Sequence, residues 1–275
     1  DAVATEAYLG TARRRVSVRR HARLVDYAMH DGCNARSWVQ VQVNSDVALI
    51  DAGTQLFTLI PGEPPALADD ATVRQQAHEV FETMVAIPLF EAHNKIHFYS
   101  WGDERCCLPK GATHATLRGA LLNLKAGDAL IFEEAIGPST GRPEDADPTK
   151  RCAVRLIHVE TLDSSGQPLT DLLSGEAISE IFWRDEDALP FPLCISAQTD
   201  SSHGGKFIED VSVARGNVVL ADHGRTVEQE LGAVPEAPPA KTVASACERC
   251  EPKDPVALPV RFHPKLLARP LTFAA

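Results

Sequence analysis

The hydrophobic positions of this chain follow a helical period at its amino end. In "SVRRHARLVDYAMH" (17–30), apolar residues recur at three- and four-residue intervals, the spacing of an amphipathic helix; they are Val18, Ala22, Val25 and Met29. Ser17 is a candidate N-cap and Gly32 a candidate stop. The preceding "TEAYLGTA" (5–12) has a helix-forming composition. We therefore predict two short helices at the start of the chain.

Beyond this helical segment, apolar and polar residues alternate, as is typical of half-buried strands. In "SWVQVQV" (37–43), three valines lie on one face and a tryptophan with two glutamines on the other. The segment "DVALIDAGTQLFTLI" (46–60) reads as a strand, an Asp-Ala-Gly turn and a second strand. Two more strands are predicted on either side of Arg215-Gly216-Asn217. Further predicted strands, each bounded by Gly, Pro, Asp or Asn, cover 78–90, 95–101, 113–122, 128–137, 151–162, 178–184 and 190–196.

These elements predict an α+β, mainly β fold, with short amino-terminal helices followed by a many-stranded antiparallel β body. The sequence has neither regular βαβ alternation nor a Gly-rich phosphate loop, which excludes the simplest nucleotide-enzyme folds. We expect a helical arm at 1–34 and a β-rich body at 35–234, divided in one interpretation into two subdomains near 140–150. A Pro/Ala-rich linker at 235–259 and the start of a further segment at 260–275 follow.

Charge divides the chain into a basic start and an acidic remainder. The net charge of the 275 residues is -11, which argues against a general nucleic-acid or anionic-membrane binder. Residues 1–40 carry seven arginines against four acidic residues, so this part has a net charge of +3 and the rest -14. The basic start is either a solvated helix face or a surface that docks onto an acidic partner protein. No segment has the length of a membrane span or the pattern of a signal peptide, so we expect a protein made in the cytoplasm.

The seven cysteines predict reduced thiols rather than a disulfide scaffold. Most lie in apolar contexts, where a thiol behaves as a small hydrophobe: Cys106, Cys107, Cys152 and Cys194. Cys247-x-x-Cys250 has the spacing of half a zinc site, and His263 is the nearest further ligand in sequence. Because a structural zinc needs two more ligands, incidental thiols are the favoured interpretation, and no metal or cofactor is assigned.

An acidic cluster at Glu144, Asp145 and Asp147 offers carboxylate oxygens to calcium. It lacks the glycine and the distal bidentate glutamate of an EF-hand loop, so a solvated loop is favoured.

Two other pairs of ionisable residues invite chemical interpretations. Glu133 and Glu134 are adjacent on a predicted strand and therefore point to opposite faces, so they cannot flank one substrate. His93 and His97 would lie about 13 Å apart along a strand, too far to share a metal. We predict ordinary structural roles for both pairs.

Asp222-His223-Gly224 follows the apolar "NVVLA". Such a sequence suits a turn, in which a short polar side chain caps backbone amides and glycine takes a positive φ. The alternatives are a metal ligand or a general base with its orienting carboxylate, although sequence neighbours seldom reach that geometry. The turn is the favoured interpretation.

Specific blocks along nearly the whole chain resemble one family, the baseplate assembly proteins of contractile phage-tail-like injection systems. These proteins in turn resemble the baseplate wedge proteins of contractile-tailed phages. The blocks include "EAYLGTARRRVSVRRHARLVDYAMHDGCNARSWV" (6–39), "IDAGTQLFTLIPG" (50–62), "HNKIHFYSWGDERCCLPKGATHATLRG" (93–119), "LKAGDALIFEEAIGPSTG" (124–141), "EIFWRDEDALPFPLCIS" (180–196) and "VARGNVVLADHGRTVEQELGAVP" (213–235). The usual "IPAGT" of the family stands here as "IDAGT". Family members are usually much longer, so we expect this chain to be part of a longer protein.

The resemblance implies a structural, non-enzymatic protein without cofactors. It would pair with a second wedge protein and with further copies of itself around a central hub and spike, and link to tube and sheath subunits, without nucleic acid or membrane insertion. The helical arm would join a helical bundle, and its expected interface residues are Arg13, Arg14, Arg15, Val18, Arg19, Ala22, Val25 and Met29. The alternative function is a metal-dependent hydrolase or carbohydrate-active β domain that uses Asp222, His223 and one of the acidic loops.

Overall fold

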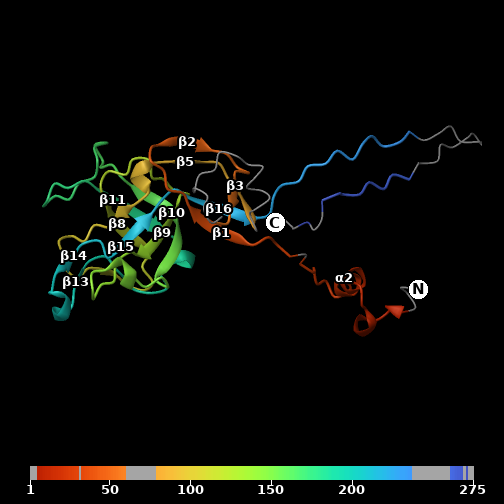
Figure 1. Ribbon diagram of the computed structural model, residues 1–275, viewed down its shortest axis with the longest axis horizontal. Helices are drawn as coiled ribbons and strands as arrows, with labels where there is room; N and C mark the ends of the chain where they lie inside the picture. Colours follow the sequence, from red (N-terminus) through yellow and green to blue (C-terminus); the bar gives the residue numbers. More distant parts are fainter. Residues whose placement is uncertain (1–4, 31, 60–78, 237–260, 269–270, 272–275) are drawn as a thin grey trace, which may run out of the picture. The chain divides into compact units, whose positions relative to one another are not determined.

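Strands make up most of the regular structure in this computed structural model, which describes residues 5–30, 32–59, 79–236, 261–268 and 271 (Figure 1). The chain forms two compact units. One comprises 34–225 and carries the strands; the other comprises the described residues of 1–33 and 226–273 and carries the helix. The predicted mainly β fold with a short helical start is confirmed.

Six antiparallel strands of the larger unit form a sheet that nearly closes into a barrel (Figure 1). An isolated bridge between Phe98 and Leu117 joins the two ends of this sheet. The strand order is β6 (Ile96–His97), β15 (Ser212–Arg215), β9 (Ala129–Glu134), β10 (Arg151–Glu160), β11 (Ile178–Trp183) and β8 (His114–Arg118).

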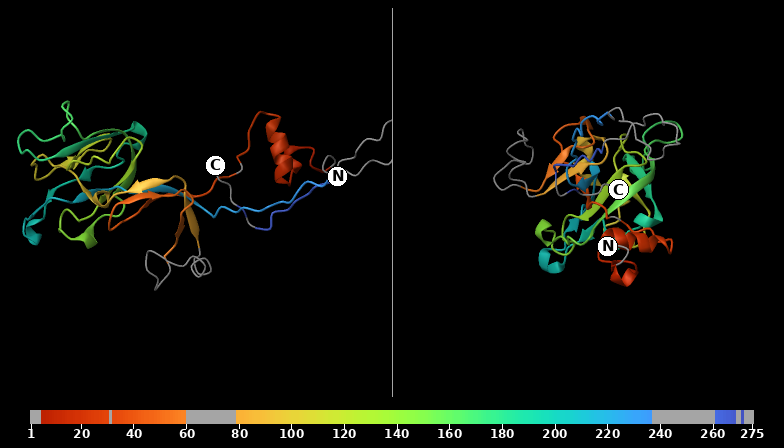
Figure 2. Two further views of the ribbon diagram at one scale, coloured as in Figure 1. Left: turned by 90° about the horizontal axis from the view of Figure 1, so that it is seen from above. Right: turned by 90° about the vertical axis from the view of Figure 1, so that its right-hand side faces the viewer.

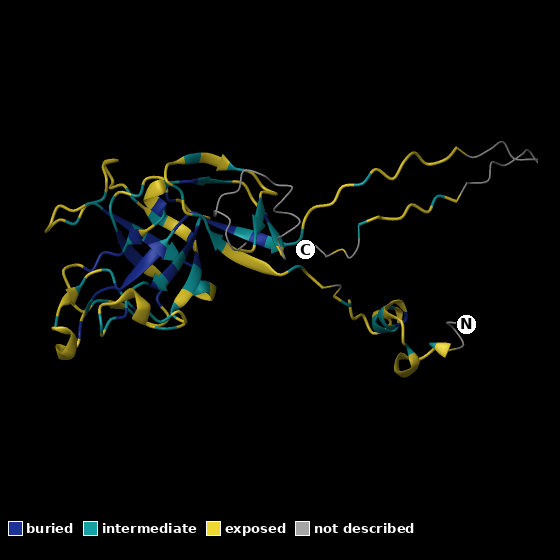
Figure 3. Ribbon diagram, in the orientation of Figure 1, coloured by how far each residue is buried: buried dark blue, intermediate teal, exposed yellow. Residues whose placement is uncertain are grey.

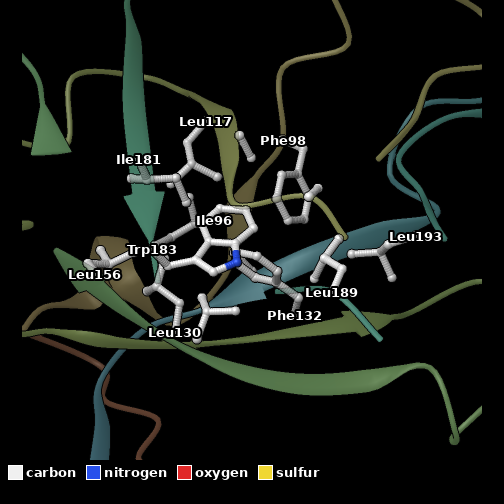
Figure 4. Close-up of a cluster of buried hydrophobic side chains, with 14 of the residues drawn as sticks. Ile96, Phe98, Leu117, Leu130, Phe132, Leu156, Ile181, Trp183, Leu189 and Leu193 are labelled. Carbon is white, nitrogen blue, oxygen red and sulfur yellow. The ribbon is translucent and has the colours of Figure 1, made fainter. Parts of the chain in front are cut away.

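The barrel forms because alternate residues of its strands are apolar and turn inward. In β9 and β11 the buried positions alternate along most of each strand. Phe132 lies edge-on to Phe98 and to Trp183, with ring centroids 5.0 and 5.3 Å apart, a favourable aromatic arrangement. The buried cluster includes Ile96, Phe98, Leu117, Leu130, Phe132, Leu156, Ile181, Trp183, Leu189 and Leu193 (Figure 4). Figure 3 shows the buried barrel strands beside exposed connecting loops.

A second, four-stranded antiparallel sheet has the order β1 (Arg36–Gln40), β16 (Val218–His223), β4 (Val80–Thr83) and β3 (Gln55–Phe57). Strands β15 and β16 follow each other directly, so Gly216 and Asn217 alone carry the chain from the barrel to this sheet (Figure 2). Three two-stranded pairs complete the unit: β2 (Val47–Ile50) with β5 (Ile87–Leu89), β7 (Cys107–Leu108) with β12 (Leu193–Cys194), and β13 (Ala197–Gln198) with β14 (Phe207–Ile208).

The predicted strand at 78–90 is in fact two strands, β4 and β5, which pair in different sheets. The predicted Asp-Ala-Gly turn is present: Gly53 has a φ of 81°, and the Thr54 hydroxyl donates to the Asp51 carbonyl at 2.7 Å. It does not form a hairpin, because β2 pairs with β5 and β3 with β4. The predicted subdomain division near 140–150 falls on the connection between β9 and β10, which are neighbours in one sheet.

The prediction of reduced thiols is wrong for one pair. Cys107 and Cys194 lie opposite each other on β7 and β12, with Cα atoms 3.8 Å apart, and form a disulfide. The register of two short strands 87 residues apart in sequence brings them together, and local apolar context carries no sign of it. Cys106 and Cys152 are free thiols, and burial raises the pKa of Cys152 to about 11.

Within the described part of the chain, no helix is both long and apolar enough to cross a membrane. The longest is α2 (Arg15–Arg23), which follows a 3-10 turn, η1 (Leu9–Thr11).

Candidate functional site

The expected interface residues lie on α2 and on the segments that flank it, and the carboxylate of Glu6, which was not predicted to have a role, organises the start of this helix. Glu6 Oε1 accepts hydrogen bonds from the backbone N–H groups of Arg13 and Arg14 at 3.1 and 3.2 Å. Its Oε2 accepts from the hydroxyl of Ser17. These bonds, the one from Ser17 above all, lower the pKa of Glu6. Ser17 is therefore the third residue of the helix and a donor to Glu6, so its prediction as the N-cap is wrong.

The helix is also shorter than its apolar period suggests. It ends at Arg23, and Asp26 then takes a φ of 57°, which turns the backbone out of the helix before the predicted stop at Gly32. The following chain returns toward the start of α2, where Arg15 Nη2 donates to the carbonyl of His30 at 2.7 Å. Left-handed geometry suits the short polar side chain of aspartate, which explains a break within an otherwise helical pattern.

The helix end divides the expected apolar seam. Val18 and Ala22 lie half-buried on α2, whereas Val25 and Met29 lie beyond its end. Val25 is 78% exposed, and Leu24 beside it is 82% exposed. The structure thus places two seam residues on the helix and leaves a strongly exposed apolar pair at its carboxyl end.

The arginines of this unit form a dense positive surface. Of the expected interface residues, Arg13, Arg14 and Arg15 are exposed and Arg19 is half-buried. The last turn of α2 is also basic, with Arg20, His21 and Arg23, a favourable placement at the negative end of the helix dipole. At the amino end of α2, the arginines place positive charge beside the positive end of the helix dipole, and the Glu6 carboxylate offsets this unfavourable charge.

Asp222 and His223 belong to strand β16, so their interpretation as a turn is wrong. Asp222 pairs in register with Arg36 on β1 and Glu82 on β4. His223 pairs with Phe81 on β4. The backbone partners on both sides hold the two residues extended, and Gly224, with a φ of 115°, follows the end of the strand.

Consecutive strand residues point to opposite faces, which separates the two side chains. Asp222 Oδ2 accepts from Asn34 Nδ2 at 3.4 Å. His223 Nε2 lies 2.6 Å from Glu79 Oε2, and its ring packs edge-on against Phe81. Asp222 therefore does not orient His223, and the pair lacks the geometry of a general base with its carboxylate.

The other acidic candidates form separate ion pairs. Glu133 pairs with Arg151 and Arg215, each at 2.8 Å. Glu134 is buried on the opposite face, where it pairs with Lys150 at 3.0 Å and accepts from the Asp147 backbone N–H at 2.9 Å. The prediction that the two glutamates point to opposite faces is confirmed.

Glu144 and Asp145 lie in an exposed 3-10 turn, η3 (Pro143–Asp145). The hydroxyl and backbone N–H of Thr149 both donate to Asp147, and the hydroxyl bond is the main cause of its lowered pKa.

The two histidines occupy different elements. His93 is buried in a 3-10 turn, η2 (Glu91–His93), where burial lowers its pKa, whereas its sequence context suggested a strand. His97 is in β6, and its Nδ1 lies 2.8 Å from Asp210 Oδ1. No group of three His, Cys, Asp or Glu side chains that could hold a metal occurs within the described ranges. Cys247 and Cys250 lie outside them, and His263 is exposed.

A buried polar network holds the link between the two sheets. Asn217 has a φ of 53° and is buried. Its Oδ1 accepts from the Phe90 N–H at 2.9 Å, while Nδ2 donates to the Phe90 carbonyl at 2.8 Å and to Asn94 Oδ1 at 3.1 Å. Asn94 in turn exchanges two hydrogen bonds with the backbone of Val43. The side chain of Asn217 thus bonds the backbone of Phe90 in the way that a neighbouring strand would.

Gly216 has a separate steric role in this link. Its N–H donates to the His93 carbonyl at 2.8 Å, and a Cβ at this position would lie 2.8 Å from the Cβ of His93. Only glycine permits this approach without displacement of the neighbouring chain. The pattern Arg-Gly-Asn after a strand is the sequence signal for the link, but its partners are more than a hundred residues away.

Comparisons of this chain with protein-family models, with curated proteins and with solved structures give no match.

Proposed function

We propose that this chain is a structural component of the baseplate wedge of a contractile, phage-tail-like injection system. In this role it binds a second wedge protein and further copies of itself around a central hub and spike, and it links them to tube and sheath. It acts without catalysis or a cofactor. It is made and assembled in the cytoplasm and ends within the particle.

One observation carries this proposal: the most distinctive of the sequence blocks that resemble the wedge-protein family form structural parts of the fold. "GNVVLADHG" (216–224) supplies the Gly216-Asn217 link and the central strand β16. "GDERCCLPKGAT" (102–113) supplies β7 with its disulfide, and the Gly111 N–H donates to the Leu189 carbonyl at 2.8 Å. Both blocks hold strands together, as expected of a subunit that transmits force.

The helical unit supports the same role as a partner-binding element. A helix of nine residues is below the roughly 12–15 residues at which isolated helices become marginally stable in water. Packing against partner helices would supply the missing stabilisation and cover the exposed Leu24 and Val25. The surrounding arginines favour acidic neighbours at that contact.

Co-expression of the full-length protein with its genomic neighbours tests the proposal, followed by purification, negative-stain microscopy and mass spectrometry of the co-purifying chains. We expect rings or wedge-shaped particles that contain a second baseplate-like protein. A lone monomer that binds zinc or calcium stoichiometrically would contradict the proposal and favour the metal-dependent hydrolase.

Charge reversal tests the helical surface separately. Arg13→Glu with Arg20→Glu should reduce co-purification of the second wedge protein, and higher salt should weaken the wild-type complex, because ions screen exposed charges. Lys110→Glu with Arg184→Glu reverses two exposed charges of the larger unit and serves as a matched control. Equal effects of the two double variants would show that net charge, rather than this surface, matters.

A further inference from the structure

The connection between β10 and β11 ends in a turn that exposes two leucines. Leu172 is 96% exposed and Leu173 98% exposed, the highest values among large hydrophobic side chains of the described residues. Fully exposed leucines next to each other give no stabilisation to the isolated fold, because their burial is what lowers the free energy. Their place in the molecule therefore points to a contact with another surface.

The turn is held rigidly rather than left loose. Asp171 Oδ1 accepts from the Leu173 N–H at 3.0 Å, and its Oδ2 accepts from the hydroxyls of Tyr99 and Ser174 at 2.7 and 2.8 Å. The hydrogen bond from the Leu173 N–H and those from the two hydroxyls lower the pKa of Asp171 to about 2. Because Tyr99 is buried against the barrel, it fixes the turn to the rigid body. A pre-ordered apolar tip loses little conformational entropy on binding.

The same unit has a cavity of about 240 Å³ beneath the four-stranded sheet. Its wall includes the buried Leu130 and the partly exposed Trp38 and Val85, and Lys125 contributes a cation. A dry apolar cavity of about 150 Å³ accepts a benzene ring, so this one has room for a leucine side chain. The second leucine of the tip would lie on the exposed edges of Trp38 and Val85.

The tip region is acidic, and the cavity lining includes one exposed cation, Lys125. Residues 161–177 contain three acidic residues and no lysine or arginine. Glu176 is paired with Arg118 at 2.9 Å, whereas Asp163 and Asp171 are held by neutral donors. The exposed ammonium of Lys125 beside the cavity favours an acidic tip. Asp128 also lines the cavity, and burial is the main cause that raises the pKa of its carboxyl.

The tip and the cavity lie at different ends of one compact unit. The green β10–β11 connection projects from the barrel on the side away from β1 and β16, whose residues line the cavity (Figures 1 and 2). The tip therefore does not reach the cavity of its own molecule. A second copy supplies the tip without this restriction.

We propose that the Leu172–Leu173 tip of one molecule inserts into the Trp38 cavity of a second copy. The contact is heterologous, because each molecule offers its tip to one neighbour and its cavity to another. Repetition of this contact gives a ring if the rotation between neighbouring molecules closes on the first one, and a filament if it does not. This contact rests on the proposed function, in which copies of the chain bind one another. It requires no other protein, so the purified chain is sufficient to test it.

Analytical ultracentrifugation of the full chain over a concentration series tests the contact. We expect concentration-dependent species larger than dimers. Leu173→Asp in the tip and Val85→Asp at the cavity should each lower the association constant at least tenfold. Leu59→Asp, at a position 86% exposed in the same unit, is the matched control and should leave association unchanged. Circular dichroism establishes that each variant is folded, and Leu173→Ala provides a milder change at the tip.

Mixing the two variants gives the sharper test. The Leu173→Asp chain keeps its cavity and the Val85→Asp chain keeps its tip, so the mixture should form dimers and stop there. A wild-type chain that remains monomeric, single variants that associate like the wild type, or a mixture without dimers would overturn the proposal. Retained binding of Leu173→Asp to the second wedge protein would show that the proposed function stands even if self-association fails.

Discussion

Asn217 joins the two sheets of the larger unit, so its replacement is the most direct test of how the body is held together. Asn217→Ala removes the hydrogen bonds to the N–H and carbonyl of Phe90 and to the side chain of Asn94. It also places alanine at a φ of 53°, a left-handed conformation that asparagine tolerates better. The Phe90 backbone groups then lose partners at a site where Asn217 is 6% exposed.

The expected cost follows from these terms. Three hydrogen bonds at a net of about 1 kcal/mol each, with a further penalty for the unpaired Phe90 N–H, amount to about 3–4 kcal/mol; the Phe90 carbonyl still accepts from the His93 N–H. The left-handed backbone adds about 1 kcal/mol for alanine. A total of about 4–5 kcal/mol is a large share of the roughly 5–15 kcal/mol by which native proteins are stable. Asn217→Gly loses the same hydrogen bonds but avoids the backbone strain of about 1 kcal/mol. The greater conformational freedom of glycine in the unfolded chain offsets part of that gain, so this variant should be less damaging than Asn217→Ala by at most about 1 kcal/mol.

Urea unfolding followed by tryptophan fluorescence measures these differences, since Trp183 lies in the barrel and Trp38 on the four-stranded sheet. The midpoint should fall in the order wild type, Asn217→Gly, Asn217→Ala, with the slope unchanged if unfolding stays two-state. A loss below about 1 kcal/mol for Asn217→Ala would refute the assignment of Asn217 as the link, since one net hydrogen bond contributes that much. Separate transitions of the two tryptophans in the variant would show that the sheets have come apart.

Three further changes test other parts of the structure. Cys107→Ser with Cys194→Ser opens a cross-link between residues 87 apart and should lower the free energy of unfolding by about 4.5 kcal/mol on the chain-entropy estimate; wild type that unfolds identically with and without reductant would contradict it. Gly216→Ala should cost about 1–3 kcal/mol through its contact with His93, measured by the same unfolding assay, and an unchanged midpoint would show that the neighbouring chain gives way freely. The lowered pKa of Glu6 means that its contribution to the helical unit is present above its unfolded pKa and is lost as pH falls through the lower folded value. Helical circular dichroism should therefore decrease on acidification in the wild type and change less in Glu6→Gln; identical titrations would contradict the capping role.

The sequence by itself determined the β body and the faces of its strands. Alternation along 128–137, 151–162 and 178–184 predicted strands that the structure has as β9, β10 and β11. The same alternation placed Glu133 and Glu134 on opposite faces. These features are local, because the side chains of a strand alternate between faces whatever its partners are.

The tertiary structure alone decided which strands pair and where the helix stops. The apolar run at 78–90 looks continuous, yet β4 and β5 divide it between two sheets. Asp222-His223 has the composition of a turn, but hydrogen-bonding partners on β1 and β4 hold it extended.

The same holds for Asn217 and for the disulfide. Asn217 finds its partner Phe90 at a separation of 127 residues, and Cys107 finds Cys194 at 87. A periodic pattern records how deeply a position is buried and on which face. It does not record the partner, because pairing depends on the free energy of contacts between segments that only the folded chain brings together.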